Sequence, residues 1–93
     1  MALELERSWR IARQVAIRPE PFGALAYHFG TRRLSFLKTR KLLAVVQALD
    51  VQPTALAACR SAGVTEEEMP AYRQALATLA SSGIVVEGTR DAS

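Results

Sequence analysis

The chain has 93 residues, of which 49% are hydrophobic, and its formal net charge is +3 at pH 7. This length suits one small domain, and the hydrophobic content is too high for a disordered chain. No apolar run reaches the roughly 18 residues that a transmembrane helix needs, and the first ten residues lack the pattern of a secretory signal. The single cysteine, Cys59, excludes an internal disulfide. We therefore expect one cytoplasmic domain over residues 1–93, with no membrane association.

Charge is distributed unevenly along the chain. Residues 1–47 contain nine Lys or Arg against three Glu, whereas residues 48–93 contain three Arg against six acidic residues. A basic half can attract nucleic acid, an anionic membrane surface or an acidic peptide. Charge by itself does not choose among these partners.

The first predicted elements are a loosely held arm and a short strand. Residues 1–8 are expected to be flexible, although Leu3 and Leu5 could pack locally, and Trp9 anchors the chain where order begins. Val15 and Ile17 alternate with Gln14, Ala16 and Arg18, which is a short strand pattern. Two prolines, Pro19 and Pro21, are expected to end this strand because neither can donate to a sheet.

Residues 18–37 predict a β-hairpin. Gly30 and Thr31 fit a two-residue loop in which Gly30 takes the positive-φ position of a type II′ turn. Counting outward from this loop gives the pairs His28 with Arg33, Tyr27 with Leu34, Ala26 with Ser35, and Leu25 with Phe36. One face of the hairpin is then apolar and is expected to pack as core: Leu25, Tyr27, Leu34 and Phe36. The outer strand, residues 33–37, is expected to have a free edge.

Two helices are predicted next. Thr39 can cap the first, whose apolar stripe has the spacing of one helical face: Leu42, Val45, Val46 and Leu49. Pro53 opens a short second helix, roughly residues 54–62, which Gly63 ends. We interpret Cys59 in that helix as a small buried apolar side chain.

A third helix completes the predicted order. Thr65 and Glu68 fit a capping box, Pro70 predicts an irregular first turn or a restart, and Gly83 ends the helix. Residues 84–86 fit either a short strand or an apolar plug, and residues 88–93 a flexible tail, so we expect order over about 9–87. Strands grouped before helices predict an α+β domain, with a three-stranded antiparallel sheet followed by a three-helix bundle.

The string RPEPFGALAYHFGTRRLSFLK, together with this order of elements, resembles the mycofactocin biosynthesis chaperone family, within the PqqD-like precursor-peptide recognition domains. The resemblance covers about residues 9–86 and is strongest over 15–38. It implies a winged-helix-like module that performs no chemistry itself. Such modules bind the leader of a ribosomally made precursor peptide, here the mycofactocin precursor, and deliver it to a radical S-adenosylmethionine (radical SAM) maturase. The iron–sulfur clusters and the cofactor belong to that partner.

The resemblance also implies a binding mode. An extended leader adds as a strand beside the last hairpin strand, and its side chains enter a groove toward the third helix. Carried onto this sequence, the peptide-binding residues are Arg32, Arg33, Leu34, Ser35, Phe36, Leu37, Met69, Tyr72, Arg73 and Leu76. The arginines would meet leader acids and affect association rate and orientation more than affinity.

Simpler roles exist for the same residues. Leu34 and Phe36 are more probable as core than as ligand contacts, and Tyr72 is more often a core aromatic. Arg32 and Arg33 can simply keep a hairpin tip soluble. Glu66, Glu67 and Glu68 are expected to serve only helix capping.

Catalysis and DNA binding are less favoured by the sequence. His28 and Cys59 lack the neighbours that a metal site or a catalytic triad needs, so we expect no enzyme, no metal and no cofactor. Winged helices with basic wings often bind DNA, which leaves DNA binding as an alternative. However, the second helix offers only Arg60, and the third opens with three glutamates, so we expect no nucleic acid partner. A subunit that stabilises a larger enzyme without touching a peptide is a further alternative.

Overall fold

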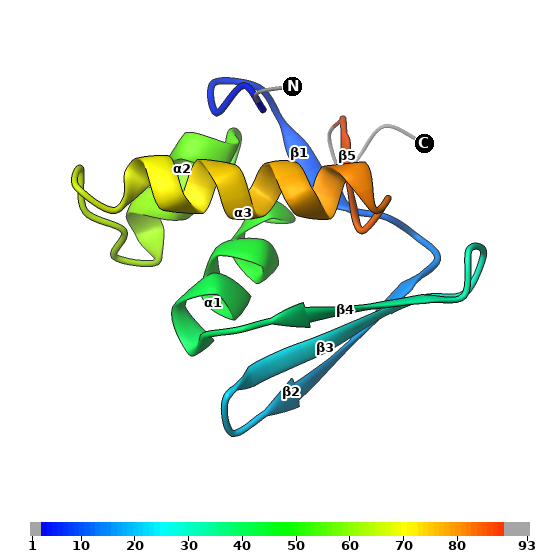
Figure 1. The fold of residues 1–93 in the computed structure, drawn as a ribbon. Coiled ribbons are helices and arrows are strands. Elements are labelled where there is room, and N and C mark those ends of the chain that lie inside the picture. Colours follow the sequence, from blue (N-terminus) through cyan, green and yellow to red (C-terminus); the bar gives the residue numbers. More distant parts are fainter. Residues whose placement is uncertain (1–2, 89–93) are drawn as a thin grey trace.

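The computed structural model describes residues 3–88, which form two antiparallel sheets and three helices. In chain order the elements are β1 (Trp9–Ile11), β2 (Val15–Glu20), β3 (Gly23–His28), β4 (Arg33–Leu37), α1 (Arg40–Leu49), α2 (Ala55–Ser61), α3 (Met69–Ser81) and β5 (Val85–Glu87). One sheet has the order β2-β3-β4, and the other pairs β1 with β5. Figure 1 shows the helices on one side of the three-stranded sheet, with the β3–β4 turn pointing away from them. Within residues 3–88, no helix has the length and apolar character needed to cross a membrane.

The α+β class is confirmed, but the sheet prediction is incomplete. The three-stranded sheet precedes three helices as expected, whereas the pairing of β1 with β5 was not predicted. Residues 85–87 are therefore a strand, which decides between the two alternatives left open for that segment. The winged-helix likeness stays a prediction.

The hairpin has the predicted register but presents the opposite face to the core. His28 pairs with Arg33 and Leu25 with Phe36, as expected. However, Ala24, Ala26 and Leu37 are fully buried, whereas Leu34 and Phe36 are 52% and 56% exposed. The expectation that Leu34 and Phe36 belong to the core is therefore wrong. Small alanine side chains let α1 approach the sheet closely, so the side with the smaller residues is the buried one.

The hairpin loop also differs from the predicted type II′ turn. It contains four residues between His28 and Arg33, and Arg32, not Gly30, has the positive φ, at 61°. The Arg32 amide donates to the His28 carbonyl at 2.7 Å. His28 Nδ1 accepts hydrogen bonds from the amides of Gly30 and Thr31 at 3.0 and 3.1 Å. His28, which is buried at the base of the loop, therefore organises it, which is a structural role.

β2 runs further than predicted, through Pro19 to Glu20, with Pro19 opposite Ala24. The prediction that Pro19 ends the strand is wrong. β2 is an edge strand of its sheet. A proline is tolerated on such a strand, where its missing N–H has no neighbouring strand to meet.

The three helices begin and end close to the predicted positions. Thr39 Oγ1 accepts from the Leu42 amide at 3.0 Å, and Thr54 Oγ1 accepts from the Ala57 amide at 3.1 Å. The predicted stripe of α1 is buried. Thr65 and Glu68 form the predicted reciprocal capping box. The box stabilises a turn that precedes the helix, because α3 starts at Met69, with Pro70 in its first turn. The predicted irregular first turn or restart near Pro70 is confirmed, because residues 66–68 are turns and the helix itself begins at Met69.

The segment before β1 packs against the helices. Leu3 and Leu5 are buried, the Leu56 amide donates to the Leu5 carbonyl at 2.8 Å, and the Ala55 amide donates to the Arg7 carbonyl at 3.0 Å. The expectation of a loosely held arm is therefore wrong for residues 3–8. At the other end the Gly88 amide donates to the Ser8 carbonyl. The rest of both predicted tails, residues 1–2 and 89–93, lies outside the described residues.

Candidate functional site

The predicted free edge belongs to β4. Because the sheet order is β2-β3-β4, residues 3–88 supply a neighbouring strand on only one side of β4. Successive N–H groups of a strand point to opposite sides. Main-chain donors and acceptors along one side of residues 33–37 are thus available to another extended chain.

A groove of about 320 Å³ lies beside this edge, between the end of β4, the start of α1 and one face of α3. Its floor and walls are mainly apolar, and its lining residues are Phe36, Lys38, Thr39, Leu42, Ala71, Tyr72, Ala75, Thr78 and Leu79. On α3 these residues recur at the three- and four-residue spacing of one helical face. We call this feature the β4–α3 groove. Its alanines are small, which helps to keep the groove open.

Two of the predicted peptide-binding residues, Phe36 and Tyr72, line the β4–α3 groove. Two others, Leu37 and Leu76, are 0% and 1% exposed and belong to the core beneath it. Leu34 and the three arginines of the prediction are exposed, while Ser35 and Met69 are half-buried. The structure thus brings most of the predicted set around one edge and groove.

Sequence reasoning missed several residues of the groove. Lys38, Thr39 and Leu42 enter it from the β4–α1 junction and the first turn of α1. Thr39 and Leu42 were recognised only for helix capping and the core. The periodic spacing of Ala71, Ala75 and Thr78 with Tyr72 was the available signal on α3.

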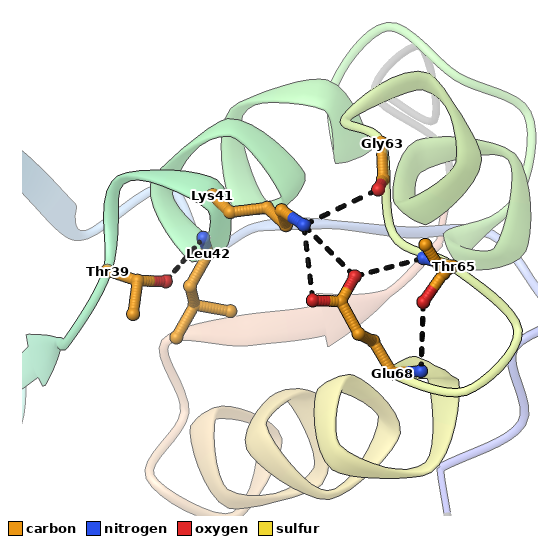
Figure 2. Close-up of polar contacts among 6 residues, drawn as sticks. All are labelled: Thr39, Lys41, Leu42, Gly63, Thr65 and Glu68. Carbon is orange, nitrogen blue, oxygen red and sulfur yellow. Dashed lines mark hydrogen bonds and ion pairs between the residues drawn. The ribbon is translucent and has the colours of Figure 1, made fainter.

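An ion pair links α1 to the start of α3, near the groove (Figure 2). Lys41 Nζ, in the first turn of α1, lies 3.0 and 3.2 Å from the two carboxylate oxygens of Glu68, at the start of α3. Glu68 Oε1 also accepts from the Thr65 amide at 3.0 Å. The expectation that Glu68 serves only capping is therefore wrong, because the same carboxylate links two helices.

The electrostatics of this pair favour both charged forms. The hydrogen bond from the Thr65 backbone, followed by that from Lys41, lowers the pKa of Glu68. The hydrogen bond to Glu68 raises the pKa of Lys41. Both side chains are about one-third exposed, so solvent screens their attraction.

The described residues offer little for catalysis. Residues 3–88 contain no group of three side chains that could hold a metal ion. Cys59 is a free, fully buried thiol, and burial raises its pKa, which disfavours the reactive thiolate. This agrees with the predicted role of Cys59 as a small apolar side chain.

Comparisons with known proteins find close relatives of this chain. Among curated proteins, a peptide chaperone MftB of Mycobacterium tuberculosis is 57% identical over 81 residues, which cover 87% of this chain and 74% of the relative. The peptide chaperone MftB of Mycobacterium ulcerans is 53% identical over 90 residues, covering 97% of this chain and 83% of the relative. That of Mycolicibacterium smegmatis is 50% identical over 86 residues, covering 92% and 84%.

The same comparisons bear on the alternatives. No solved structure gives a significant match. None of these relatives supports the DNA-binding alternative, and the role named for them, that of a peptide chaperone, is not catalytic. The profile described as the peptide chaperone MftB family matches residues 8–86. The chain therefore belongs to the peptide chaperone MftB family, as the resemblance of its hairpin sequence implied.

Proposed function

We propose that this chain binds the leader of the mycofactocin precursor peptide and presents it to a radical SAM maturase, which carries the iron–sulfur clusters. The proposal places this work in the cytoplasm. Its support comes from the family and from one observation: the free edge of β4 lies beside the apolar β4–α3 groove. An edge supplies hydrogen bonds and a groove supplies side-chain pockets, which together are the requirements of β-strand addition.

In this mechanism the leader lies antiparallel or parallel to β4 and extends the sheet by one strand. Its side chains alternate, so every second one points toward α3. Those side chains enter the groove between Phe36, Tyr72 and Ala75, with the main chain of Leu34 and Ser35 bonding the leader. Leu37 and Leu76 support this surface from the core, and Met69 lies at its margin.

The exposed arginines act before docking. Arg32 and Arg33 lie at the tip of the hairpin, and Arg73 lies on α3 one residue after Tyr72. Exposed cations around an apolar groove attract acidic segments and orient them, while salt screens the attraction. The leader that fits this surface is therefore extended, apolar at alternate positions and acidic near its ends.

A proline series tests the β4 edge. Proline is placed singly at Leu34, Ser35 and Phe36, and the affinity for a labelled synthetic precursor is measured by fluorescence anisotropy. Because N–H groups alternate, either Ser35 or the pair Leu34 and Phe36 faces the free edge. Proline at an edge-facing position should weaken binding by about 10-fold or more, because it removes a donor and adds a clash.

Alanine at the same three positions is the matched control, since it removes the side chain and keeps the N–H. Circular dichroism identifies the proline variants that remain folded. Normal peptide binding by every folded proline variant would show that β4 is not the docking edge. If the unaltered chain binds no precursor yet still binds the maturase, it acts as a stabilising subunit instead.

The arginines are tested by charge removal. The double variant Arg32→Gln and Arg33→Gln should slow association with the precursor several-fold and flatten the dependence of its affinity on salt. Stopped-flow measurements at several salt concentrations report both quantities. Arg60→Gln, on α2, serves as the control for loss of a cation elsewhere. An unchanged salt dependence in the double variant would remove these arginines from the mechanism.

A further inference from the structure

The face of the three-stranded sheet that turns away from the helices is apolar. Strand alternation and the observed register place Leu25 and Tyr27 of β3 on this face with Leu34 and Phe36 of β4. Two phenylalanines from the turns extend it. Phe22 lies 6.4 Å from Phe36 between ring centroids, and the Phe29 ring meets Tyr27 edge to face at 5.2 Å. We call these six residues the outer sheet face.

Four of these six residues are too exposed to be explained by packing, whereas Leu25 and Tyr27 are half-buried. Phe29, Phe36 and Leu34 are each more than half exposed, and Phe22 nearly so. Single exposed apolar residues are ordinary, but a contiguous group on a soluble domain marks an interaction site. Within residues 3–88, no helix or strand lies across the centre of this face, because the helices lie on the opposite side of the sheet (Figure 1). Phe36, at its margin, also lines the β4–α3 groove.

The border of the outer sheet face is basic. Residues 15–38 contain one acid, Glu20, and four cations, of which Arg18, Arg32 and Lys38 adjoin this face, whereas Arg33, opposite His28, belongs to the other face. Arg18 pairs with Leu25 in the register, so it flanks this face directly, and its side chain is 80% exposed although it contacts Glu20. The complementary surface is apolar at its centre and acidic at its rim.

This charge pattern argues against a second copy of the chain. A two-fold arrangement would place this basic border against itself. The outer sheet face is also continuous with the β4 edge, because Leu34 and Phe36 belong to both. A leader added at that edge would send every second side chain to this same face.

From these observations, and resting on the proposed function, we propose that the outer sheet face docks the maturase, through an apolar maturase surface bordered by carboxylates. The outward side chains of the bound leader complete the contact. Enzyme and leader then touch each other as well as the chaperone. Each consequently raises the affinity of the chaperone for the other by the same factor, as linkage requires.

The test separates the outer sheet face from the peptide site. The double variant Leu25→Thr and Tyr27→Thr alters the central strand β3, away from the β4 edge, and threonine suits a strand. Val51→Thr is the matched control, because Val51 is an apolar residue that is 72% exposed in the segment between α1 and α2. Affinity for the immobilised maturase is measured by biolayer interferometry, with and without saturating precursor, and affinity for the precursor is measured separately by anisotropy.

The double variant should bind the maturase at least about 10-fold more weakly, while its affinity for the precursor alone stays within about two-fold of that of the unaltered chain. Val51→Thr should change neither. If the double variant does not fold, Arg18→Gln with Phe29→Thr, both exposed, should still weaken maturase binding measurably.

Three outcomes would overturn this inference. If a folded double variant binds the maturase as tightly as the unaltered chain does, the enzyme docks at another surface. Precursor binding with no maturase binding by the unaltered chain would leave the peptide role intact and remove the docking role. A chain that sediments as a dimer, and that the double variant converts to a monomer, would assign the face to a second copy. If the proposed function itself is wrong, the unaltered chain will instead fail to bind the precursor.

Discussion

At the scale of single residues, the ion pair of Lys41 and Glu68 links the two helices that border the β4–α3 groove. In the sequence, Lys41 lies between Thr39 and Leu42, which line the groove from the start of α1. Glu68 precedes α3 by one residue and Tyr72 by four. A contact between these two side chains therefore fixes the start of one wall relative to the other. Its loss should loosen the groove without exposing much core.

The pH dependence of stability tests this pair. The pKa of Glu68 is lowered in the folded chain, so its contribution is present above the ordinary carboxyl value of 4.5 and is lost as pH falls through the folded value. The pKa of Lys41 is raised from 10.5, so its contribution is present below that value and is lost as pH rises through the folded value. Glu68→Gln should therefore cost most stability near neutral pH and progressively less toward acid.

Urea unfolding of both chains at several pH values measures this difference. Glu67→Gln, one residue earlier and exposed, is the control for removing a negative charge near α3. A cost of Glu68→Gln that is the same at acid and neutral pH would show that the carboxylate charge does not matter.

At the scale of elements, Gly23 lets the start of β3 pack closely against the β4–α1 junction. A Cβ at this position would collide with the carbonyl oxygen of Leu37 and lie 2.9 Å from that of Thr39. Both atoms belong to backbone, which cannot move aside cheaply. Only glycine therefore lets the end of β4 and the cap of α1 sit against the start of β3.

Gly23→Ala should lower the free energy of unfolding by about 2 kcal/mol or more, because the junction must shift. The control is Gly63→Ala, where φ is +90° and the space is open, so only the strain of about 1–2 kcal/mol of a left-handed residue is expected. Chemical denaturation compares the two variants. A smaller cost at Gly23 than at Gly63 would mean that this close approach is unimportant.

Local signals in the sequence were sufficient for the caps and for the register of the hairpin. Thr39, Thr54 and the Thr65–Glu68 box act over three residues, so their partners are visible in the sequence. The predicted two-residue loop and the observed four-residue loop are centred on the same peptide bond. Both loops therefore give the same strand pairing, so the predicted register is correct although the predicted turn type is wrong.

Features that depend on distant packing could not be predicted in the same way. Alternation alone shows two faces of the hairpin but does not say which one meets a helix. Ala24 and Ala26 are small, and their burial depends on how closely α1 packs. The edge strand of the candidate site was predicted, whereas Lys38 and Leu42 joined the groove only through the placement of α1 against α3.

At the scale of the whole molecule, the segment before β1 is part of the hydrophobic core. Leu3 and Leu5 belong to the same buried cluster as the stripe of α1. The hydrogen bonds from Ala55 and Leu56 tie this segment to the first turn of α2. It therefore holds a helix that lies far from it in sequence.

Leu5→Ala should lower the free energy of unfolding by about 2–4 kcal/mol, as expected for a buried leucine whose removal leaves a cavity. Glu6→Ala, at the exposed neighbouring position, should change it by less than about 0.5 kcal/mol. Urea unfolding monitored by Trp9 fluorescence measures both. Equal stability of the two variants would restore the interpretation of residues 3–8 as a loosely held arm.

The ladder between β1 and β5 joins the first strand of the described residues to the last. Trp9 stands opposite Glu87 and Ile11 opposite Val85, and Arg7 reaches Glu87 at 2.6 Å. Each of these two short strands has the other as its sole ladder partner within residues 3–88. Fraying at one extremity consequently releases the other, so the two extremities melt as one cooperative unit. The edge of β4, at which we propose that the leader binds, belongs to the separate sheet, so the pairing of β1 with β5 does not occupy it.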